Sequence, residues 1–494
     1  MSKSAIIFIY TCFTIVLFAQ AERSVQGAFG AVTIDGKVWN QIALRPVIPI
    51  WKFGVALDLV FYIDADGNIH KDEWDFSDGE AIKNTLIDKI YYIRFGFPND
   101  PLYFKVGSLD YVKLGYGILV NGYSNAIEYP QVRKVGLDFR VKRDLFSVQG
   151  FVNDFKENLG LTGFRVQTPV LAGIPIGVSA VMDRNQHLGL KDRDGDKYPD
   201  FFDHFPDDED KYSNAMENYE EWEQIYLEFE GSNPDSFDVW FTTLPLDHNT
   251  FNHAEIKDDP MSAIAIDIGY PVVTEQNMSI AIYAQIAKMF GEANYPGNPD
   301  STVSLGSGII PVGVAAKFGP AYFNLEYRII PKGNFEFGYW NKTYEIERVS
   351  IESDLIKTKE SKLGRFGRQK GIFANFSMDV FGLIGFHMAY QNLRGDIWDG
   401  NMFSNQANQS FQSELGLKKR ISRIKTAKLF YQQLNVPNPF EFEFTESTVM
   451  GYRIAIELGS GMVLNYTYQR TFRMNSDGEL EPVNLTGIET SFTF

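Results

Sequence analysis

Five aspartates within a stretch of twelve residues could hold a metal ion. Counted from the first, they occupy positions 1, 3, 5, 9 and 12, and they are Asp192, Asp194, Asp196, Asp200 and Asp203. A hard cation such as calcium takes about six to eight oxygen ligands, and a short loop with oxygens at these steps can wrap one ion. The backbone carbonyl of Tyr198, at position 7, would add another ligand. The spacing therefore predicts a calcium site.

The stretch resembles the thrombospondin type 3 calcium repeats, including a bacterial form in which a phenylalanine-proline pair follows, here Phe205 and Pro206. It departs from an EF-hand loop at position 6, where Lys197 replaces the usual glycine and the glycine is displaced to Gly195. A residue other than glycine at positive φ would strain that turn. A solvated acidic face is the alternative interpretation.

A second stretch has the same spacing with a weaker set of oxygens. Its polar residues at the matching positions are Asp64, Asp66, Asn68, Asp72 and Asp75. Its glycine, Gly67, stands at position 4, as Gly195 does in the first stretch, and not at position 6. A solvated hairpin tip is the favoured interpretation of this second stretch.

Charged residues also recur at alternate positions of segments that otherwise have the pattern of strands. We predict that these side chains point into an interior space, and they include Arg94, Lys105, Lys134, Arg140, Glu326, Arg328, Arg453 and Glu457, with Asp138 and His387. Charges of both signs suit a hydrated passage for polar solutes, but they could equally pair across strands and satisfy one another. The four cations from Arg94 to Arg140 could form a basic wall with a weak preference for anions.

The segments that carry these charges alternate between apolar and polar residues. From Lys52, the residues Phe53, Val55 and Leu57 point one way while Ala56 and Asp58 point the other. The same period of two recurs in AYFNLEYRII and MVLNYTYQRTF, and it is typical of half-buried strands. The composition, with 15% aromatic residues and 42 glycines, also favours strands over helices. We therefore predict an all-β protein.

Three features favour a closed antiparallel transmembrane barrel over a soluble sandwich. Short turns alternate with long gaps such as 64–88, 184–260 and 331–369, and aromatic residues gather toward the strand ends. The final segment, GIETSFTF, ends at Phe494 and resembles the terminal signal of bacterial outer-membrane barrel proteins, which the insertion machinery recognises. An even number of about 16 to 20 strands is expected. The glycine-rich stretch from Tyr111 fits either an external loop or a segment that folds inward.

The chain divides into three parts. Residues 1–21 have the basic, apolar and small-residue parts of a secretory signal peptide, which contains the single cysteine, Cys12. Residues 22–494 form the predicted barrel. Within it, residues 184–260 form an acidic external insertion with 21 acidic and 6 basic residues. Helical spacing between 214 and 229 predicts a short helix there.

These features predict a porin-like outer-membrane channel for small polar solutes, with an external loop ordered by calcium. The alternative is a barrel with a closed lumen that anchors a surface for binding or adhesion. None of the six histidines stands in a zinc-binding or serine-triad motif, so no enzyme is predicted. Nucleic-acid binding is excluded by the net charge of −17 on an exported chain. Neither the solute nor the oligomeric state follows from the sequence.

Overall fold

The structure, a computed structural model, describes most of the chain, and its described residues are 24–34, 37–70, 74–76, 79–130, 132–171, 174–192, 198–200, 203, 205, 226–227, 236–237, 259–298, 301–352, 355–459, 461–475 and 478–493. The expected signal peptide, the expected helix between 214 and 229 (apart from 226–227) and the terminal Phe494 lie outside them. Contacts divide the chain into a body, Met1–Gln186 with Pro260–Phe494, and a second unit, His187–Asp259.

The body is a closed antiparallel β-barrel. Its described residues form one sheet of 21 strands, of which β3 and β4 are two halves of a single barrel strand interrupted at Asp58, giving 20 barrel strands. Neighbours along the wall pair antiparallel, and β27 returns to pair with β1 from Gln26↔Thr493 to Val32↔Gly487. The predicted fold class is confirmed, with a strand number at the upper end of the expected range.

The barrel strands follow one another around the wall in chain order. They are β1 (Ser24–Ile34), β2 (Lys37–Ile50), β3 (Phe53–Leu57) with β4 (Leu59–Ile63), β5 (Ile90–Phe95), β6 (Leu102–Gly107), β9 (Gly136–Lys142), β10 (Ser147–Val152), β11 (Leu161–Leu171), β12 (Ile174–Asp183), β13 (Met261–Thr274), β14 (Met278–Phe290), β17 (Ser307–Phe318), β18 (Ala321–Ile330), β21 (Phe366–Val380), β22 (Ile384–Trp398), β23 (Phe403–Leu417), β24 (Ile424–Val436), β25 (Val449–Gly459), β26 (Met462–Met474) and β27 (Leu480–Thr493).

Smaller elements lie in the connections. They are the hairpins β7 (Val112–Lys113) with β8 (Asn121–Tyr123), β15 (Glu292–Asn294) with β16 (Thr302–Ser304) and β19 (Val349–Glu352) with β20 (Leu355–Thr358), the helices α2 (Gly79–Asp88) and α5 (Tyr344–Glu347), and the 3₁₀ turns η2 (Gln186–Gly189) and η5 (Ser361–Arg365). No helix among the described residues has the length and apolar character of a membrane span.

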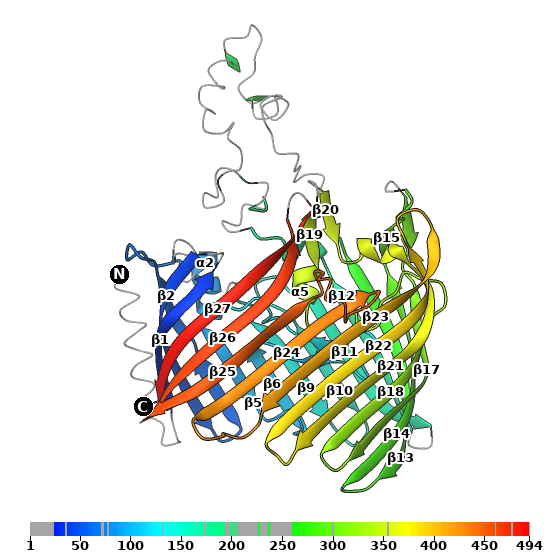
Figure 1. Ribbon diagram of the computed structural model, residues 1–494, viewed down its shortest axis with the longest axis horizontal. Helices are drawn as coiled ribbons and strands as arrows, with labels where there is room; N and C mark the ends of the chain where they lie inside the picture. The colour runs from blue at the N-terminus through cyan, green and yellow to red at the C-terminus, as the bar shows by residue number, and fades with distance from the viewer. Residues whose placement is uncertain are drawn as a thin grey trace. The chain divides into compact units, whose positions relative to one another are not determined.

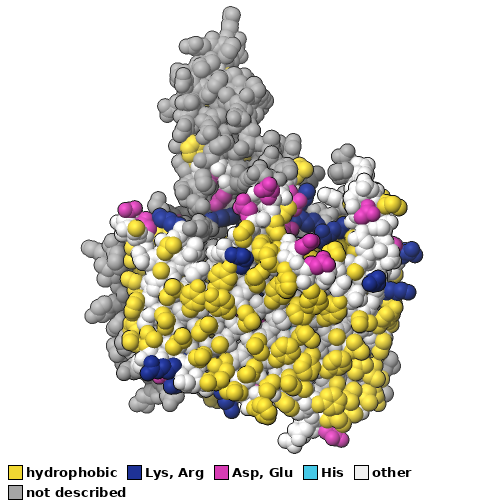
Figure 2. Space-filling view, viewed as in Figure 1, with side chains coloured by type: hydrophobic (Ala, Val, Ile, Leu, Met, Phe, Trp, Pro, Cys, Tyr) yellow, Lys and Arg dark blue, Asp and Glu magenta, His cyan; other side chains and the backbone are white. Residues whose placement is uncertain are grey.

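The two faces of the wall differ as the sequence pattern predicts. On β13, Ile264 and Ile266 are 47% and 49% exposed on the outside, whereas Ala265 and Asp267 are buried inside. On the visible outer face in Figure 2, hydrophobic side chains cover the strands between the rims, and charged side chains gather near the rims. The barrel thus presents an apolar belt outward and polar groups inward.

Connections differ in length between the two ends of the barrel. At the lower rim in Figure 1, strands are joined by short turns, such as residues 51–52 between β2 and β3 and residues 319–320 between β17 and β18. At the opposite rim the connections include the long stretches 64–89, 108–135 and 331–365. This arrangement confirms the predicted alternation of short turns with long connections.

Candidate functional site

One long connection crosses the interior of the barrel. Residues 108–130, the first inner segment, follow β6 and lead toward β9. The ring of Tyr116 stacks on Tyr283 of β14, with 3.9 Å between the ring centroids. Farther along, Gln469 of β26 donates a hydrogen bond to the Ile127 carbonyl at 2.6 Å. Because the strands from β17 to β25 separate β14 from β26, the segment spans the lumen.

A second connection, residues 331–365 between β18 and β21, packs against the first; we call it the second inner segment. Val120 and Trp340 form a parallel β-bridge, and the Asn121 amide donates to the Trp340 carbonyl at 3.1 Å. Apolar residues from both segments cluster around this bridge, among them Ile118, Leu119, Tyr123, Phe335, Phe337, Tyr339 and Tyr344. A lumen this wide cannot be filled by side chains of the wall alone, so the segments supply a core of their own.

The glycine-rich stretch from Tyr111 therefore folds inward, which was one of the two interpretations left open by its sequence. Its turns require glycine, since Gly117 has a φ of 97° and Gly122 a φ of 77°. The wall also leaves room for it, because a Cβ placed on Gly269 of β13 would lie 1.9 Å from the Tyr116 hydroxyl.

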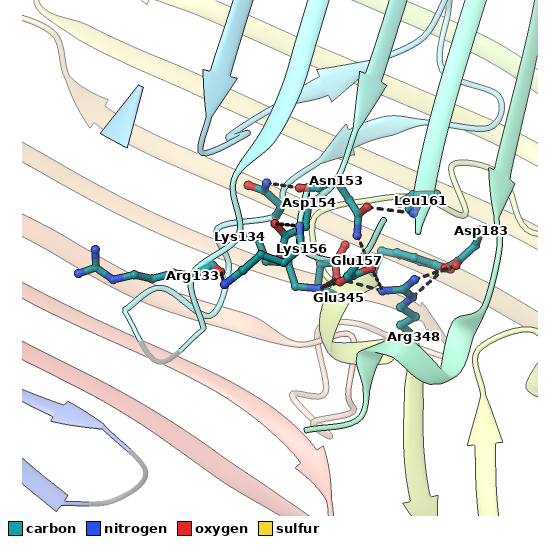
Figure 3. Close-up of polar contacts among 12 residues, drawn as sticks. Arg133, Lys134, Asn153, Asp154, Lys156, Glu157, Leu161, Asp183, Glu345 and Arg348 are labelled. Atoms are coloured by element: carbon teal, nitrogen blue, oxygen red, sulfur yellow. Dashed lines mark hydrogen bonds and ion pairs between the residues drawn. The ribbon is translucent and has the colours of Figure 1, made fainter. Parts of the chain in front are cut away.

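A buried guanidinium connects the second inner segment to the barrel wall (Figure 3). Arg348 donates from Nε and Nη2 to both carboxylate oxygens of Asp183, at the end of β12, each at 2.7 Å, and from Nη1 to Glu157 at 2.8 Å. The Lys134 ammonium lies 2.5 Å from both Glu157 and Glu345. The cluster joins the second inner segment to β12 and to the connections around β9 and β10.

Ion pairing favours the charged forms of Glu157 and Arg348 inside the protein. Burial alone would raise the pKa of Glu157, but Lys134 and Arg348 lower it to about 2. Burial alone would lower the pKa of Arg348, but Glu157, Asp183 and Glu345 raise it well above its usual value. Removing one partner from such a buried cluster typically costs about 3–5 kcal/mol. The cluster is therefore a clamp on the second inner segment.

Beside the inner segments the lumen retains a cavity of about 620 Å³, a size typical of sites for small molecules. Arg45 of β2 lines it and lies 2.8 Å from both Asp58 and Glu489. Strands β22 to β25 and the second inner segment contribute a different set of charges, consisting of His387, Glu414, Lys428, Arg453 and Lys342. The cavity is thus polar, and its charges come from distant parts of the chain.

Three of the four cations predicted to form a basic wall lie on neighbouring strands. Arg94 of β5 and Lys105 of β6 stand directly opposite each other. Lys105 contacts Asp110 at 3.4 Å, and Arg140 of β9 contacts Asp138 at 3.3 Å. Because carboxylates offset two of these three charges, the wall is less basic than the sequence suggested.

Lys134, the fourth of these cations, lines the cavity from a connection and not from a strand face. β9 begins at Gly136, and Lys134 lies in the connection before it. There Glu157 and Glu345 neutralise its charge. The alternating pattern extends past the start of the strand, which is why the sequence placed Lys134 on a strand face.

Glu326 and Arg328 are buried on the inner face of β18 and pair with each other at 2.6 Å. The Tyr283 hydroxyl donates to Glu326 at 2.6 Å, and Arg328 donates to Gln391 of β22 at 2.6 Å. This pair fits the alternative interpretation, in which inward charges satisfy one another.

Arg453 and Glu457 both lie on β25 but have different surroundings. Glu457 forms an ion pair with Arg420 in the short turn between β23 and β24, whereas Arg453 lines the cavity. Lys428 and Lys342, which also line the cavity, were not identified from sequence. Lys428 belongs to the alternating pattern of β24, so the sequence could have predicted it. Lys342 belongs to no alternating segment.

The predicted calcium loop is described only in part. Asp194 and Asp196 lie outside the described residues, as does most of the chain around them. In the second unit, the Asp200 amide donates to the Lys191 carbonyl at 2.8 Å, and the Asp203 carboxylate accepts the Phe205 amide at 2.7 Å. Asp192 and Tyr198 are also described. Among the described residues, no group of three or more His, Cys, Asp or Glu side chains is arranged to hold a metal.

The second stretch of similar spacing forms a hairpin tip. One oxygen of the Asp64 carboxylate accepts the amides of Asp66 and Asn68, at 3.0 and 2.8 Å. Its other oxygen lies 3.4 Å from the Lys37 ammonium. The carboxylate thus closes its own turn, and Asp72, a further member of this stretch, lies outside the described residues.

Comparison with known proteins gives distant likenesses only. No family profile and no curated protein sequence matches the chain. Among solved structures, Pseudomonas aeruginosa OpdL is 8% identical with a TM-score of 0.36, over 96% of this chain and 97% of that one. The outer membrane protein OprD from the same organism is 8% identical with a TM-score of 0.35, over 96% of both chains. OpdK with vanillate is 7% identical with a TM-score of 0.35, over 96% of this chain and 97% of that one.

Proposed function

We propose that this protein is a bacterial outer-membrane channel for small polar solutes, narrowed by its two inner segments. The observation that carries the proposal is the cavity of about 620 Å³ inside a barrel whose outer face is apolar. Lipid contacts the apolar belt, and the lumen offers water and charged groups to a solute. The long connections then face outward from the cell and the short turns face the periplasm.

Current recordings from the purified full-length protein in a planar bilayer test this function. We expect discrete conductance steps that are small for a barrel of this size, because the inner segments occupy much of the lumen. The same preparation should come from the outer-membrane fraction and should shift in gel mobility on heating, as closed barrels do. Recovery as a soluble periplasmic protein would contradict the membrane location.

A closed lumen would give a different result in the same recordings. The apolar core between the inner segments favours this second function, a barrel that anchors a surface for binding or adhesion. The change in gel mobility on heating, here called the heat shift, shows whether a preparation is folded. A folded preparation that carries no current would support the anchor and reject the channel.

We also propose that calcium orders the external insertion, residues 184–260. The support is the spacing of Asp192, Asp194, Asp196, Asp200 and Asp203, with the carbonyl of Tyr198. Carboxylates packed this closely repel one another unless a cation joins them. Extracellular calcium modules bind at about 10⁻⁴ to 10⁻³ M, so an external loop would be partly to largely occupied.

Removal of calcium should therefore expose the insertion to proteases. With a chelator, we expect faster cleavage between Arg184 and Pro260 while the heat shift of the barrel is unchanged. Asp194→Ala combined with Asp196→Ala should have the same effect with calcium present. The control, Asp207→Ala with Asp208→Ala, removes equal charge outside the predicted spacing and should leave cleavage slow. Cleavage that responds to neither the chelator nor the first pair would show a solvated acidic face.

A further inference from the structure

Two cations face each other across neighbouring strands inside the cavity. Lys428 of β24 and Arg453 of β25 are direct register partners, and both line the cavity. Like charges in this arrangement destabilise a sheet. Glu414 contacts Lys428 at 2.8 Å, which relieves only part of the repulsion, because Arg453 forms no ion pair with any described residue. A positive pair that costs stability at this place suggests a function.

A third cation reaches the same place from the second inner segment. The Lys342 ammonium lies 4.5 Å from the ring centroid of Phe430 and also lines the cavity. It too forms no ion pair within the described parts of the chain. Burial, together with the positive charges of Lys428 and Arg453, lowers the pKa of Lys342 to about 8, against an opposing effect of Glu414. The wall and the inner segment thus bring three positive charges together.

Other cations around the cavity are compensated. Arg45 lies between Asp58 and Glu489, and Lys134 lies between Glu157 and Glu345. The excess of positive charge is therefore local.

We propose that Lys342, Lys428 and Arg453 form a binding subsite for a small dianion. Three cations and the carboxylate of Glu414 leave two positive charges, which a solute with two negative charges would balance. His387, the register partner of Glu414, places a further polar ring at the same wall. The inference rests on the proposed function, since it names the class of solute that would pause in the channel. A compact oxyanion and a short dicarboxylate share this charge.

Calorimetric titration of the purified full-length barrel tests the subsite without any current measurement. Sulfate and succinate serve as dianions and acetate as the monoanion, at equal ionic strength. We expect at least one dianion to bind about tenfold more tightly than acetate, because the second charge also meets the cluster. Preference between sulfate and succinate would distinguish an oxyanion site from a dicarboxylate site. Equal binding of all three anions would overturn the proposal.

Variants locate the binding. Arg453→Gln and Lys342→Met should each weaken dianion binding about tenfold or more, with the heat shift showing that the barrel is folded. Arg94→Gln is the matched control, since Arg94 is an inward arginine of β5 outside the lining of the cavity. If Arg94→Gln weakens binding as much as Arg453→Gln, general lumen charge explains the binding and the subsite is rejected.

The dependence on pH gives an independent readout. Lys342 faces Lys428, Arg453 and Glu414, and with a pKa of about 8 it loses its charge progressively as the pH rises through that value. Dianion binding should therefore weaken as the pH rises from 7 to 9.5, a range above the usual titration of a histidine such as His387. Lys342→Arg should keep binding constant over this range, because arginine stays protonated. If dianion binding by Lys342→Arg falls with rising pH as it does in the unchanged protein, Lys342 does not cause the pH dependence and its proposed role is contradicted.

Failure of the subsite and failure of the channel give different results. Binding of dianions by a barrel that carries no current would reject the proposed channel and leave the subsite standing. A barrel that carries current but shows no preference for dianions in the titration would support the channel and reject the subsite.

Discussion

Replacement of Arg348 by alanine is expected to raise the conductance of the barrel several-fold and to make the second inner segment sensitive to protease. The guanidinium is fully buried and holds Asp183 and Glu157 by hydrogen bonds of 2.7 to 2.8 Å. Without it, Glu157 would keep Lys134 as its cation, whereas Asp183 would remain buried with only neutral donors such as the Tyr344 hydroxyl. That loss is worth about 3–5 kcal/mol, which is enough to release residues 331–348 from the lumen.

The barrel itself should survive this change. The wall is held by hydrogen bonds between strands, to which Arg348 contributes none, so the heat shift should remain. Hydrogen exchange should instead rise in the inner segments, including the first, whose Tyr123 hydroxyl donates to Glu345. Single-channel current and exchange measured on one preparation would connect the two effects.

Arg420→Ala is the matched control. Arg420 also forms an ion pair, with Glu457, but it lies exposed in a short turn at the opposite end of the barrel from the long connections. Exposed pairs contribute about 0 to 1 kcal/mol, so current and exchange should not change. If Arg348→Ala behaves like this control, the apolar core alone holds the inner segments and the clamp is unnecessary.

The wall could be predicted from sequence because lipid and lumen impose a strict alternation. On β18, Phe323 and Leu325 are exposed outward while Asn324 and Glu326 are buried, as the period of two requires. The same rule placed Arg453 on the inner face. It placed Lys134 on a strand, although Lys134 lines the cavity from a connection, since alternation does not reveal where a strand begins.

The interior could not be predicted in the same way. The stretch from Tyr111 alternates poorly, and what fixes it is a bridge between Val120 and Trp340, which are far apart in sequence. Lys342 lies in the same inner segment as Trp340, where no periodic pattern indicates which way a side chain points. Contacts between distant connections leave little trace in a single sequence, and the candidate subsite depends on one of them.

A side chain at Gly30 is expected to prevent most of the protein from assembling. Gly30 lies in the seam where β1 meets β27 and the barrel closes, opposite Glu489. A Cβ there would lie 2.0 Å from the Ile488 carbonyl oxygen and 2.8 Å from the Glu489 Cα, so Gly30→Ala would push the two strands apart. An open seam leaves two strand edges unpaired in lipid, where each unsatisfied backbone group costs on the order of several kcal/mol.

The same seam provides its own control at Gly487, the register partner of Val32. A Cβ at Gly487 would meet no atom within 4 Å, so Gly487→Ala should assemble normally. The measurement is the fraction of each variant that shows the heat shift and resists protease in outer membranes. Gly30 lies between Gln41 and Glu489 in the register of the sheet. These two residues line the cavity, and Gln41 donates a hydrogen bond to Glu489 at 2.9 Å. Normal assembly of Gly30→Ala, with Gly487→Ala as reference, would mean that β1 and β27 do not close the barrel in this register.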